Sequence, residues 1–328
     1  MKAVIIRAPG GPEVLEVREL PEPPLPPGHV RIAVRYAGLN RADLLQRRGA
    51  YAAPPGAPSD VPGLEYAGTI EAVGEGVRSI APGARVFGIV GGGAYAERIV
   101  VHEREVSPTP EGLSDTDAAA LPEASLTAYD ALFTQAGLQP GERVLIHAVG
   151  SGVGTAALQL AARAGAFVVG TSRSAEKLER CAGLGLSAGL VTRGEGFARE
   201  VLDATDGRGA DVVLDLVGGS YLPETLRACA LRARVVLVGL SAGARSEVDL
   251  GLVLARRLTL RGTVLRSRPL EEKLALAALL RERLAPMAAR RELRAVVDRV
   301  FSLAEAPAAH AYLESNASFG KVLLDLGA

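Results

Sequence analysis

The chain has 328 residues, 48% of them hydrophobic, and this length favours two domains. Its 37 basic and 37 acidic residues balance and form no long run, which excludes an electrostatic surface for nucleic acid or an anionic membrane. No stretch reaches about 18 uninterrupted apolar residues, and the start of the chain has the character of neither a signal peptide nor a membrane span. Two cysteines, Cys181 and Cys229, are too few for a disulfide framework. We therefore expect a soluble α/β protein of the cytoplasm.

Short strands separated by turns are expected over the first 120 residues. Runs with β-branched residues lie at 2–8, 29–39, 65–74, 84–90 and 94–101. The turn signals include "APGG", "PPG" and "APGA". Strands of this length at this spacing predict a small, partly open barrel.

A doubly wound domain is expected from about 122 to 293. It follows helices at 114–137, where Ser114 is a candidate cap. Apolar strands are expected at 143–149, 166–172, 188–192, 211–217, 234–240 and 258–265, with helices at 155–165, 175–185, 195–207 and 221–230. This alternation predicts a parallel sheet covered on both faces. The tail, 294–328, returns to strand, helix, strand, and either ends this domain or folds back onto the first.

A glycine-rich turn with Gly150, Gly152 and Gly154 stands between the first of these strands and its helix. Glycines let the backbone approach a pyrophosphate, whose charge is stabilised by the free amides at the helix N-terminus. The alternative is a structural βα turn, but the succession of strands and helices favours dinucleotide binding. If Gly154 is the third glycine of the usual pattern, Val149 and Ser151 replace the first two. We expect the Ser151 hydroxyl to face the cofactor, although a structural serine is possible there.

The end of the second apolar strand indicates which nicotinamide cofactor is used. An NAD site usually has an acid there to accept from the ribose 2′-hydroxyl, and the stretch 171–175 contains none. Ser172, Arg173 and Lys177 instead offer donors and positive charge that suit a 2′-phosphate. The alternative is a solvated helix start, which cations at a helix N-terminus slightly disfavour. The sequence therefore predicts NADPH as the cofactor.

Five stretches carry a resemblance to a known superfamily: "NRADLLQRRGAY", "PGLEYAGTIEAVG", "LPEASLTAYDAL", "VLIHAVGSGVGTAALQLA" and "FGKVLLDL". The whole chain resembles the medium-chain dehydrogenases/reductases, and these stretches look like the zeta-crystallin-like quinone oxidoreductases, closest to the p53-inducible ones. The resemblance implies a GroES-like, partly open β-barrel catalytic domain at 1–121 and 294–328. It also implies an NADPH-binding Rossmann domain at 122–293.

The resemblance also leads us to expect no zinc site in this chain. In the zinc alcohol dehydrogenases of the superfamily, the loop matching 38–43 supplies a metal-binding Cys, and the stretch matching 63–65 reads Gly-His-Glu. Here Asn40 stands at or near the first position and Leu64 replaces the His. Zinc needs three or four Cys, His or carboxylate ligands. The four histidines are scattered, at His29, His102, His147 and His310, and we expect each to be structural.

Several site residues are implied by the resemblance. Tyr51 is expected to donate a hydrogen bond to the quinone oxygen, unless it only packs its loop. Asp43 is expected to anchor the helix start by pairing with an arginine, and Glu65 to support the structure. Arg193 is a possible substitute for the tyrosine that many members have near Thr192. The expected catalytic residues are Tyr51, Asn40 and Ser151, and the expected cofactor-binding residues are Asn40, Thr127, Gly150, Ser151, Gly152, Val153, Gly154, Ser172, Arg173, Lys177, Gly239, Leu240, Leu265 and Lys321.

These observations predict an NADPH-dependent reductase that passes hydride or electrons to a small-molecule quinone without a metal. A quinone accepts hydride readily because the product is an aromatic hydroquinone. One alternative is reduction of the double bond of an enone or enoyl thioester, with Tyr51 as proton donor. A second alternative is a non-catalytic NADPH-binding or redox-sensing protein. We also expect a homodimer, joined through the apolar sheet edge at 256–265.

Overall fold

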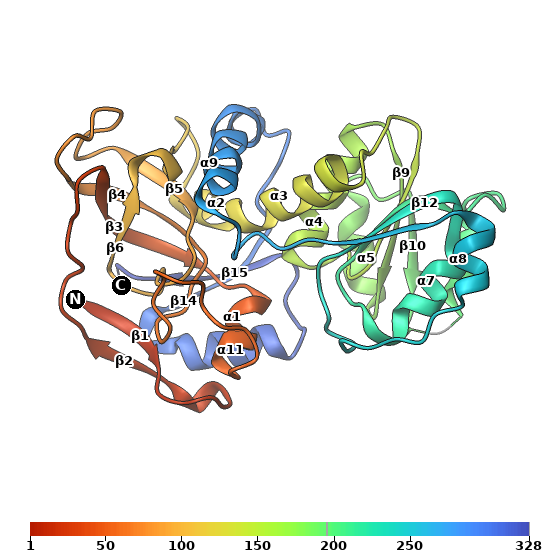
Figure 1. Ribbon diagram of the computed structural model, residues 1–328, viewed down its shortest axis with the longest axis horizontal. Helices are drawn as coiled ribbons and strands as arrows, with labels where there is room; N and C mark the ends of the chain where they lie inside the picture. Colours follow the sequence, from red (N-terminus) through yellow and green to blue (C-terminus); the bar gives the residue numbers. More distant parts are fainter. Residues whose placement is uncertain (195, 328) are drawn as a thin grey trace. The chain divides into compact units, whose positions relative to one another are not determined.

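The computed structural model describes residues 1–194 and 196–327 (Figure 1). Glu195, the first residue of one expected helix, lies outside the described residues. The chain forms two compact units. Unit 1 is Met1–Leu126 together with Leu265–Ala328, and unit 2 is Thr127–Val264. No helix of the described ranges is both long and apolar enough to cross a membrane.

Unit 1 contains an open sheet of seven strands and a two-stranded ribbon. The ribbon pairs β1 (Lys2–Ile6) with β2 (Leu15–Glu19). The larger sheet has the order β14-β15-β3-β4-β5-β7, with β6 on β3. Its strands are β3 (His29–Gly38), β4 (Glu65–Val73), β5 (Arg85–Ile89), β6 (Arg98–His102), β7 (Ser107–Pro108), β14 (Val297–Ser302) and β15 (Lys321–Asp325). In β3, alternate residues Val30, Ile32 and Val34 face the core, as expected for a strand buried on one face.

Helices complete unit 1. They are η1 (Pro12–Val14), α1 (Arg41–Arg47), η2 (Glu103–Glu105), α2 (Asp115–Ala120), α9 (Leu270–Leu279), the π-helical turn η5 (Leu280–Leu284), α10 (Ala285–Ala289), η6 (Leu303–Glu305) and α11 (Ala306–Glu314). Helix α3 (Pro122–Tyr129) contains the point where the chain passes into unit 2. The expected return of the tail to the first domain is therefore what the structure has, because β15 pairs with β3.

Unit 2 is a doubly wound domain with a six-stranded parallel sheet of order β10-β9-β8-β11-β12-β13 (Figure 1). Numbered along the unit, this order is 3-2-1-4-5-6, that of dinucleotide-binding sheets. The strands are β8 (Arg143–Ile146), β9 (Phe167–Ser172), β10 (Ala188–Val191), β11 (Ala210–Asp215), β12 (Cys229–Leu237) and β13 (Thr259–Gly262). The helical segments are η3 (Asp130–Gln135), α4 (Gly152–Arg163), α5 (Ala175–Ala182), α6 (Phe197–Ala204), η4 (Gly219–Tyr221), α7 (Leu222–Ala228) and α8 (Leu250–Arg256).

The second boundary differs from the expected one. The sequence places 265–293 with the nucleotide-binding domain, but these residues belong to unit 1. Helix α9 packs against η2, and η5 packs against β7, which buries Leu274, Leu276 and Leu280. Helices α8 and α9 and strand β2 have no counterpart among the expected elements. In β2, four of the five residues are exposed, and only Leu15 is buried.

Candidate functional site

In unit 1, the loop after β3 ends in a capped helix. Asn40 is the N-cap of α1, and its backbone N–H donates to Asp43 Oδ2 over 2.7 Å. The same buried carboxylate accepts from the Gly63 N–H over 3.1 Å and from the Tyr95 hydroxyl over 3.2 Å. Asp43 thus anchors the helix start as expected, but through backbone amides and a tyrosine instead of an arginine, because no guanidinium of the described residues contacts it.

A buried ion pair lies beside this cap. The Lys321 amino group donates to the Leu39 carbonyl over 2.6 Å and to Asn40 Oδ1 over 2.7 Å, and lies 2.5 Å from Glu65 Oε1. These three acceptors use all three N–H bonds of the ammonium. The expected contact of Lys321 with a cofactor phosphate is not favoured by this arrangement, because the amine is already fully paired inside unit 1.

Glu65 connects the ion pair to helix α3. Its Oε1 also accepts from Asn40 Nδ2 over 3.0 Å, and its Oε2 accepts from the backbone N–H of Glu123 over 2.8 Å. Asn40 Nδ2 donates in addition to the Gly38 carbonyl over 3.3 Å. Both amide N–H bonds of Asn40 are thus engaged within unit 1, and only its Oδ1 has a remaining lone pair. We call Asn40, Asp43, Glu65, Glu123 and Lys321 the polar cluster.

Burial and the charges of the polar cluster shift the pKa values of two carboxyl groups. Burial raises the pKa of Asp43 to about 6, against the opposing effect of its hydrogen bonds. Burial, and then the carboxylate of Glu65, raise the pKa of Glu123 to about 8. Among the described residues, no donor or cation is bound to the Glu123 carboxyl group. Glu123 is therefore mainly protonated at neutral pH.

A buried arginine lies next to Tyr51. Arg266 Nε donates to the Gly91 carbonyl over 2.7 Å and Nη2 donates to Gln46 Oε1 over 2.6 Å. Its guanidinium carbon lies 5.1 Å from the centre of the Tyr51 ring, within cation–π range. Arg266 Nη1 is buried and has no hydrogen-bond partner among the described residues. The guanidinium is thus fixed in place by three contacts, and the N–H bonds of Nη1 are left for a further acceptor.

In unit 2, the glycine turn leads into α4 as expected. Ser151 is the N-cap, and its Oγ accepts from the Gly154 N–H over 3.1 Å, so the hydroxyl caps the helix instead of standing free. A Cβ on Gly154 would lie 2.5 Å from the Ala148 carbonyl oxygen. Ala148 itself has a positive φ of 49°, which makes the turn tight. This close approach of helix to strand is the role of the third glycine in dinucleotide-binding turns.

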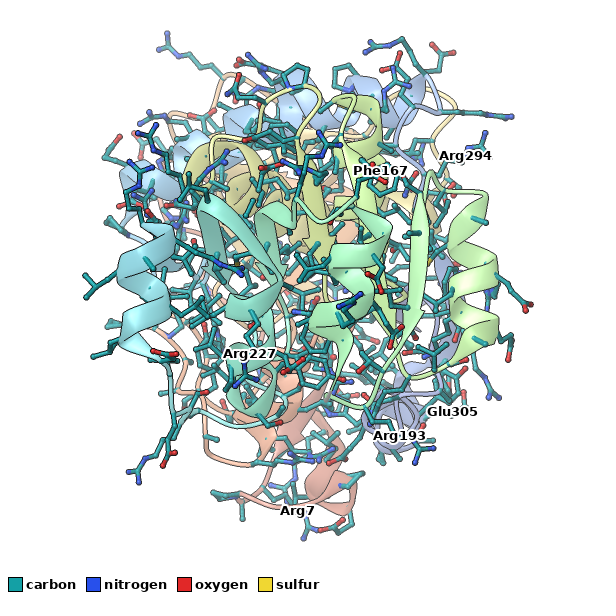
Figure 2. The ribbon with its side chains drawn as sticks, turned by 90° about the vertical axis from the view of Figure 1, so that its right-hand side faces the viewer. Arg7, Phe167, Arg193, Arg227, Arg294 and Glu305 are labelled. Atoms are coloured by element: carbon teal, nitrogen blue, oxygen red, sulfur yellow. The ribbon has the colours of Figure 1, made fainter. Side chains whose placement is uncertain are left out.

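The carboxyl ends of β9 and β10 bring cationic residues to one sheet edge. Ser172 pairs in register with Val191, so Arg173 and Arg193 both follow at the same end. Both arginines are exposed, and Arg193 is labelled in Figure 2. Ser172 Oγ accepts from the Ser174 N–H over 3.1 Å, which leaves its own O–H able to donate. This edge offers the donors that an anionic group on a ribose needs.

The remaining expected residues are spread over both units. Gly239 and Leu240 follow β12 at the carboxyl end of the sheet, and Leu240 is 55% exposed. Thr127 is buried in α3, and Leu265 is buried in unit 1. Lys177 lies in the first turn of α5. The sequence did not indicate Gln46 or Glu123, because a glutamine inside a helix and an acid in the first turn of a helix carry no distinctive signal.

The histidines bind protein groups. His147 Nδ1 lies 2.9 Å from Thr171 Oγ1 and its Nε2 lies 2.8 Å from Thr225 Oγ1. His310 stacks edge-on against Tyr95, with ring centres 5.8 Å apart. Within 1–194 and 196–327, no group of three or more His, Cys, Asp or Glu side chains is placed to hold a metal ion.

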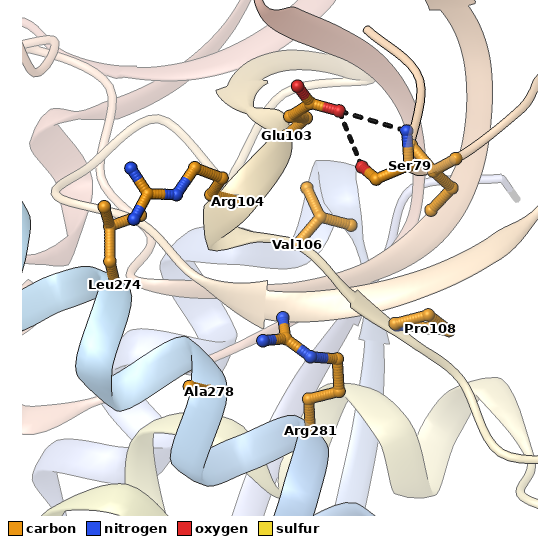
Figure 3. Close-up of a pocket in the computed structure, with 9 residues that line it drawn as sticks. Ser79, Glu103, Arg104, Val106, Pro108, Leu274, Ala278 and Arg281 are labelled. Atoms are coloured by element: carbon orange, nitrogen blue, oxygen red, sulfur yellow. Dashed lines mark hydrogen bonds between the residues drawn. The ribbon is translucent and has the colours of Figure 1, made fainter.

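A pocket of about 340 Å³ lies elsewhere in unit 1, between η2 and α9 (Figure 3). Arg104 and Arg281 extend beside it, while Glu103 Oε2 accepts from Ser79 Oγ over 2.6 Å. It shares no residue with the polar cluster or with Tyr51 and Arg266. We therefore do not assign the candidate chemistry to it.

Two family models match the chain: an alcohol dehydrogenase GroES-like domain at 26–111 and a zinc-binding dehydrogenase domain at 152–281. A quinone oxidoreductase of Pseudomonas aeruginosa is 35% identical over 331 residues, which cover 98% of this chain and 99% of that protein. Erythronolide synthase EryA2 of Saccharopolyspora erythraea is 44% identical over 205 residues, 62% of this chain but only 6% of the synthase.

Solved structures show the same architecture. The Escherichia coli quinone oxidoreductase complexed with NADPH matches with a TM-score of 0.90 at 29% identity, over 99% of this chain and 100% of that one. The CurK enoyl reductase matches with a TM-score of 0.86 at 30% identity, over 99% and 98% of the two chains. With the parallel sheet, the glycine turn and the full-length match taken together, the chain belongs to the quinone oxidoreductases of the medium-chain dehydrogenase/reductase superfamily.

Proposed function

We propose that this protein is an NADPH-dependent reductase that transfers hydride to a quinone without a metal ion. The observation that carries the proposal is the match to the Pseudomonas aeruginosa quinone oxidoreductase over 99% of its length. Unit 2 binds the cofactor in this proposal, and unit 1 supplies the groups that bind the quinone. NADPH, when bound, supplies the hydride.

The residues of unit 2 fit NADPH. The tight turn before α4 and the free amides of that helix suit a pyrophosphate. We propose that Gly150, Gly152 and Val153 line the turn, and that Ser172, Arg173 and Lys177 bind the 2′-phosphate. Arg193, at the same edge, takes part where many relatives carry a tyrosine. Thr127, Gly239, Leu240 and Leu265 remain proposed contacts toward the nicotinamide.

Unit 1 offers hydrogen-bond donors for a carbonyl oxygen. The Tyr51 hydroxyl keeps its proton well above neutral pH because burial raises its pKa. Arg266 places a positive charge beside the Tyr51 ring. Donors fixed in advance at the oxygen that becomes negative are an effective means of promoting hydride transfer. Metal independence is supported by the residues themselves, since Asn40 and Leu64 replace a Cys and a His of the zinc enzymes.

Reduction of an activated carbon–carbon double bond is the second candidate. It is favoured by the 44% identity to a segment of erythronolide synthase EryA2 and by the likeness to the CurK enoyl reductase. The same cofactor site and the same donors would serve it. The two reactions differ in whether the acceptor is a quinone or an enone, which a rate assay resolves.

The test is the initial rate of nicotinamide oxidation with NADPH and NADH, each with a para-quinone, an ortho-quinone and a simple enone, with a chelator throughout. The quinone proposal expects chelator-insensitive turnover of a quinone with a preference for NADPH. Arg173→Ala should raise the KM for NADPH about tenfold, as expected for loss of one charged contact, and leave that for NADH unchanged. Turnover of the enone alone would make the protein an alkene reductase. Tight NADPH binding without turnover of any acceptor would favour a non-catalytic binding protein.

We also propose that the protein acts in the cytoplasm as a homodimer joined at the edge of the unit 2 sheet. Both cysteines are free and buried, as suits a reducing compartment. Strand β13 is one of the two edge strands of this sheet, and all four of its residues are exposed.

A further inference from the structure

Reduction of a quinone or an enone needs a proton as well as a hydride. We propose that the carboxyl group of Glu123 gives this proton. The inference deepens the proposed function and rests on it, because it assigns a donor to the same reaction.

The position of Glu123 is fixed by the polar cluster. Its backbone N–H donates to Glu65 Oε2 over 2.8 Å at the start of α3, and Glu65 is held in turn by Lys321. The residue is only partly buried, whereas Asp43 and Glu65 are fully enclosed. Of the three acidic residues of the polar cluster, Glu123 is thus the one with exposed surface from which an acceptor could approach.

Burial, and then the neighbouring carboxylates, keep the proton on this carboxyl group. Glu65, in β4, and Asp43, in α1, both oppose its ionisation. Lys321, in β15, and Arg266 favour ionisation, but the first is bound to Glu65 and the second to Gly91 and Gln46. Asp43 accepts three hydrogen bonds and Glu65 is bound by three donors, whereas no donor of the described residues reaches the Glu123 carboxyl. A carboxyl group without donors holds its proton, and the pKa of Glu123 is raised to about 8.

Tyr51 is a weaker acid than Glu123. Its ring lies 5.1 Å from the Arg266 guanidinium carbon, and the charge of Glu123 acts on both Tyr51 and Arg266. Burial raises the pKa of Tyr51 above its usual value of 10.0. A donor with a pKa near the working pH transfers its proton more readily than one far above it. Tyr51 therefore binds and orients the acceptor oxygen, and Glu123 protonates it.

Proton transfer from Glu123 completes the reduction of the acceptor. The acceptor gains a hydride, which is one proton and two electrons, and one quinone oxygen is left as an anion. The O–H bond of the Glu123 carboxyl group breaks, an O–H bond forms on that oxygen, and Glu123 becomes a carboxylate. Water then returns a proton to Glu123. With an enone, the same proton goes to the α-carbon.

Infrared difference spectroscopy tests the protonated carboxyl group without any turnover. The wild type minus Glu123→Gln spectrum should contain the carbonyl band of a protonated carboxyl group that disappears with a midpoint near pH 8. The matched control is Glu105→Gln, since burial also raises the pKa of Glu105, which lies in η2 outside the polar cluster. Absence of the band at neutral pH would overturn the inference even if the quinone reductase activity is confirmed.

Kinetics test the transfer itself. Glu123→Gln should lower kcat about 100-fold, the size expected for loss of a general acid, and leave the Kd of NADPH unchanged. In the wild type, kcat should fall as the pH rises through about 8, with a solvent isotope effect, and both should be absent in Glu123→Gln. Glu123→Asp should restore part of kcat, and Glu105→Gln should match the wild type.

The inference would be overturned if Glu123→Gln kept the wild-type kcat, pH profile and isotope effect. It would also be overturned if Tyr51→Phe lost these three properties and Glu123→Gln did not. Failure of the proposed function would give a different set of results. In that case the wild type turns over neither quinone nor enone, while the infrared titration still reports whether Glu123 carries the proton.

Discussion

Lys321 and Glu65 form an ion pair that is almost completely removed from water, with side chains 6% and 0% exposed. The desolvation of both charges is offset only because every N–H bond of the ammonium has an acceptor and Glu65 also binds Asn40 and the Glu123 amide. The pair holds the strand-to-helix loop of α1 and the start of α3 in one arrangement. Its contribution is to position Glu123, and the pair itself contributes little net stability.

Removal of one partner should therefore be costly. Lys321→Met leaves the Glu65 carboxylate buried without a counter-ion, and we expect the free energy of unfolding to fall by about 3–5 kcal/mol in urea titrations. The double variant with Glu65→Leu should recover much of that loss. Lys2→Met, at an exposed position, is the control. A loss no larger than that of the control would contradict the role of the ion pair.

The raised carboxyl pKa values also predict how stability depends on pH. Folding raises the pKa of Asp43 from 3.8 to about 6 and that of Glu123 from 4.5 to about 8. The native state then holds protons that the unfolded chain has lost, so stability falls as the pH rises from about 5 to 8. Glu123→Gln should flatten this decrease, most clearly above pH 6. Unfolding curves at several pH values check it; a wild-type stability that rises across this range would be the opposite result.

At the scale of elements, the turn between β8 and α4 shows how one glycine sets a local geometry. Gly154 has no positive φ, yet a Cβ there would lie 2.5 Å from the Ala148 carbonyl and 2.6 Å from the Val149 carbonyl. The helix can approach the strand only because this side chain is absent. The Ser151 cap then leaves the first amides of α4 directed at the proposed pyrophosphate.

Gly154→Ala should push α4 away from β8. We expect NADPH affinity to fall about tenfold or more and the melting temperature to drop, because backbone atoms cannot yield as a flexible side chain would. Gly183→Ala is a matched control in unit 2, since a Cβ at Gly183 meets nothing within 4 Å and its φ of −68° suits alanine. Calorimetric titration measures the NADPH affinity of both variants. Equal affinities for Gly154→Ala and Gly183→Ala would rule out this account of the turn.

At the scale of the whole molecule, the exposed edge of unit 2 is the main unexplained apolar surface. Leu254, in α8, is 76% exposed, and Leu260, in β13, is 50% exposed. An edge strand presents unpaired backbone groups, and exposed apolar residues beside it favour association with a second copy. This is the physical basis of the proposed homodimer.

Leu254→Lys with Leu260→Lys should convert the dimer to a monomer. Charges placed in a desolvated symmetric contact face each other, which costs several kcal/mol and weakens association by orders of magnitude, about 100-fold or more. Val17→Lys is the control, because Val17 is 36% exposed in β2 of unit 1. Light scattering at micromolar concentration measures the oligomeric state, and a wild type that is already monomeric would refute the dimer.

Features that depend on local pattern could be predicted from the amino-acid sequence alone. Continuous apolar strands, the helices between them and the glycine turn specify the parallel sheet of unit 2, and β13 is at its edge as expected. The role of Asp43 as an anchor of a helix start was also predictable, because capping acts over three residues, but its partners Gly63 and Tyr95 were not. Such signals survive in the linear sequence because the interacting groups are neighbours along the chain.

Properties that depend on partners distant along the chain could be established only from the folded structure. Lys321 meets Glu65 across more than half the chain, which turned an expected phosphate contact into a buried ion pair. Helix α9 belongs to unit 1 because it packs against η2, and its own sequence carries no signal that indicates this unit. The protonation of Glu123 likewise depends on burial and on Glu65, a carboxylate from another strand. Desolvation and charge–charge energies depend on distances in three dimensions, so they cannot be predicted from positions along the chain.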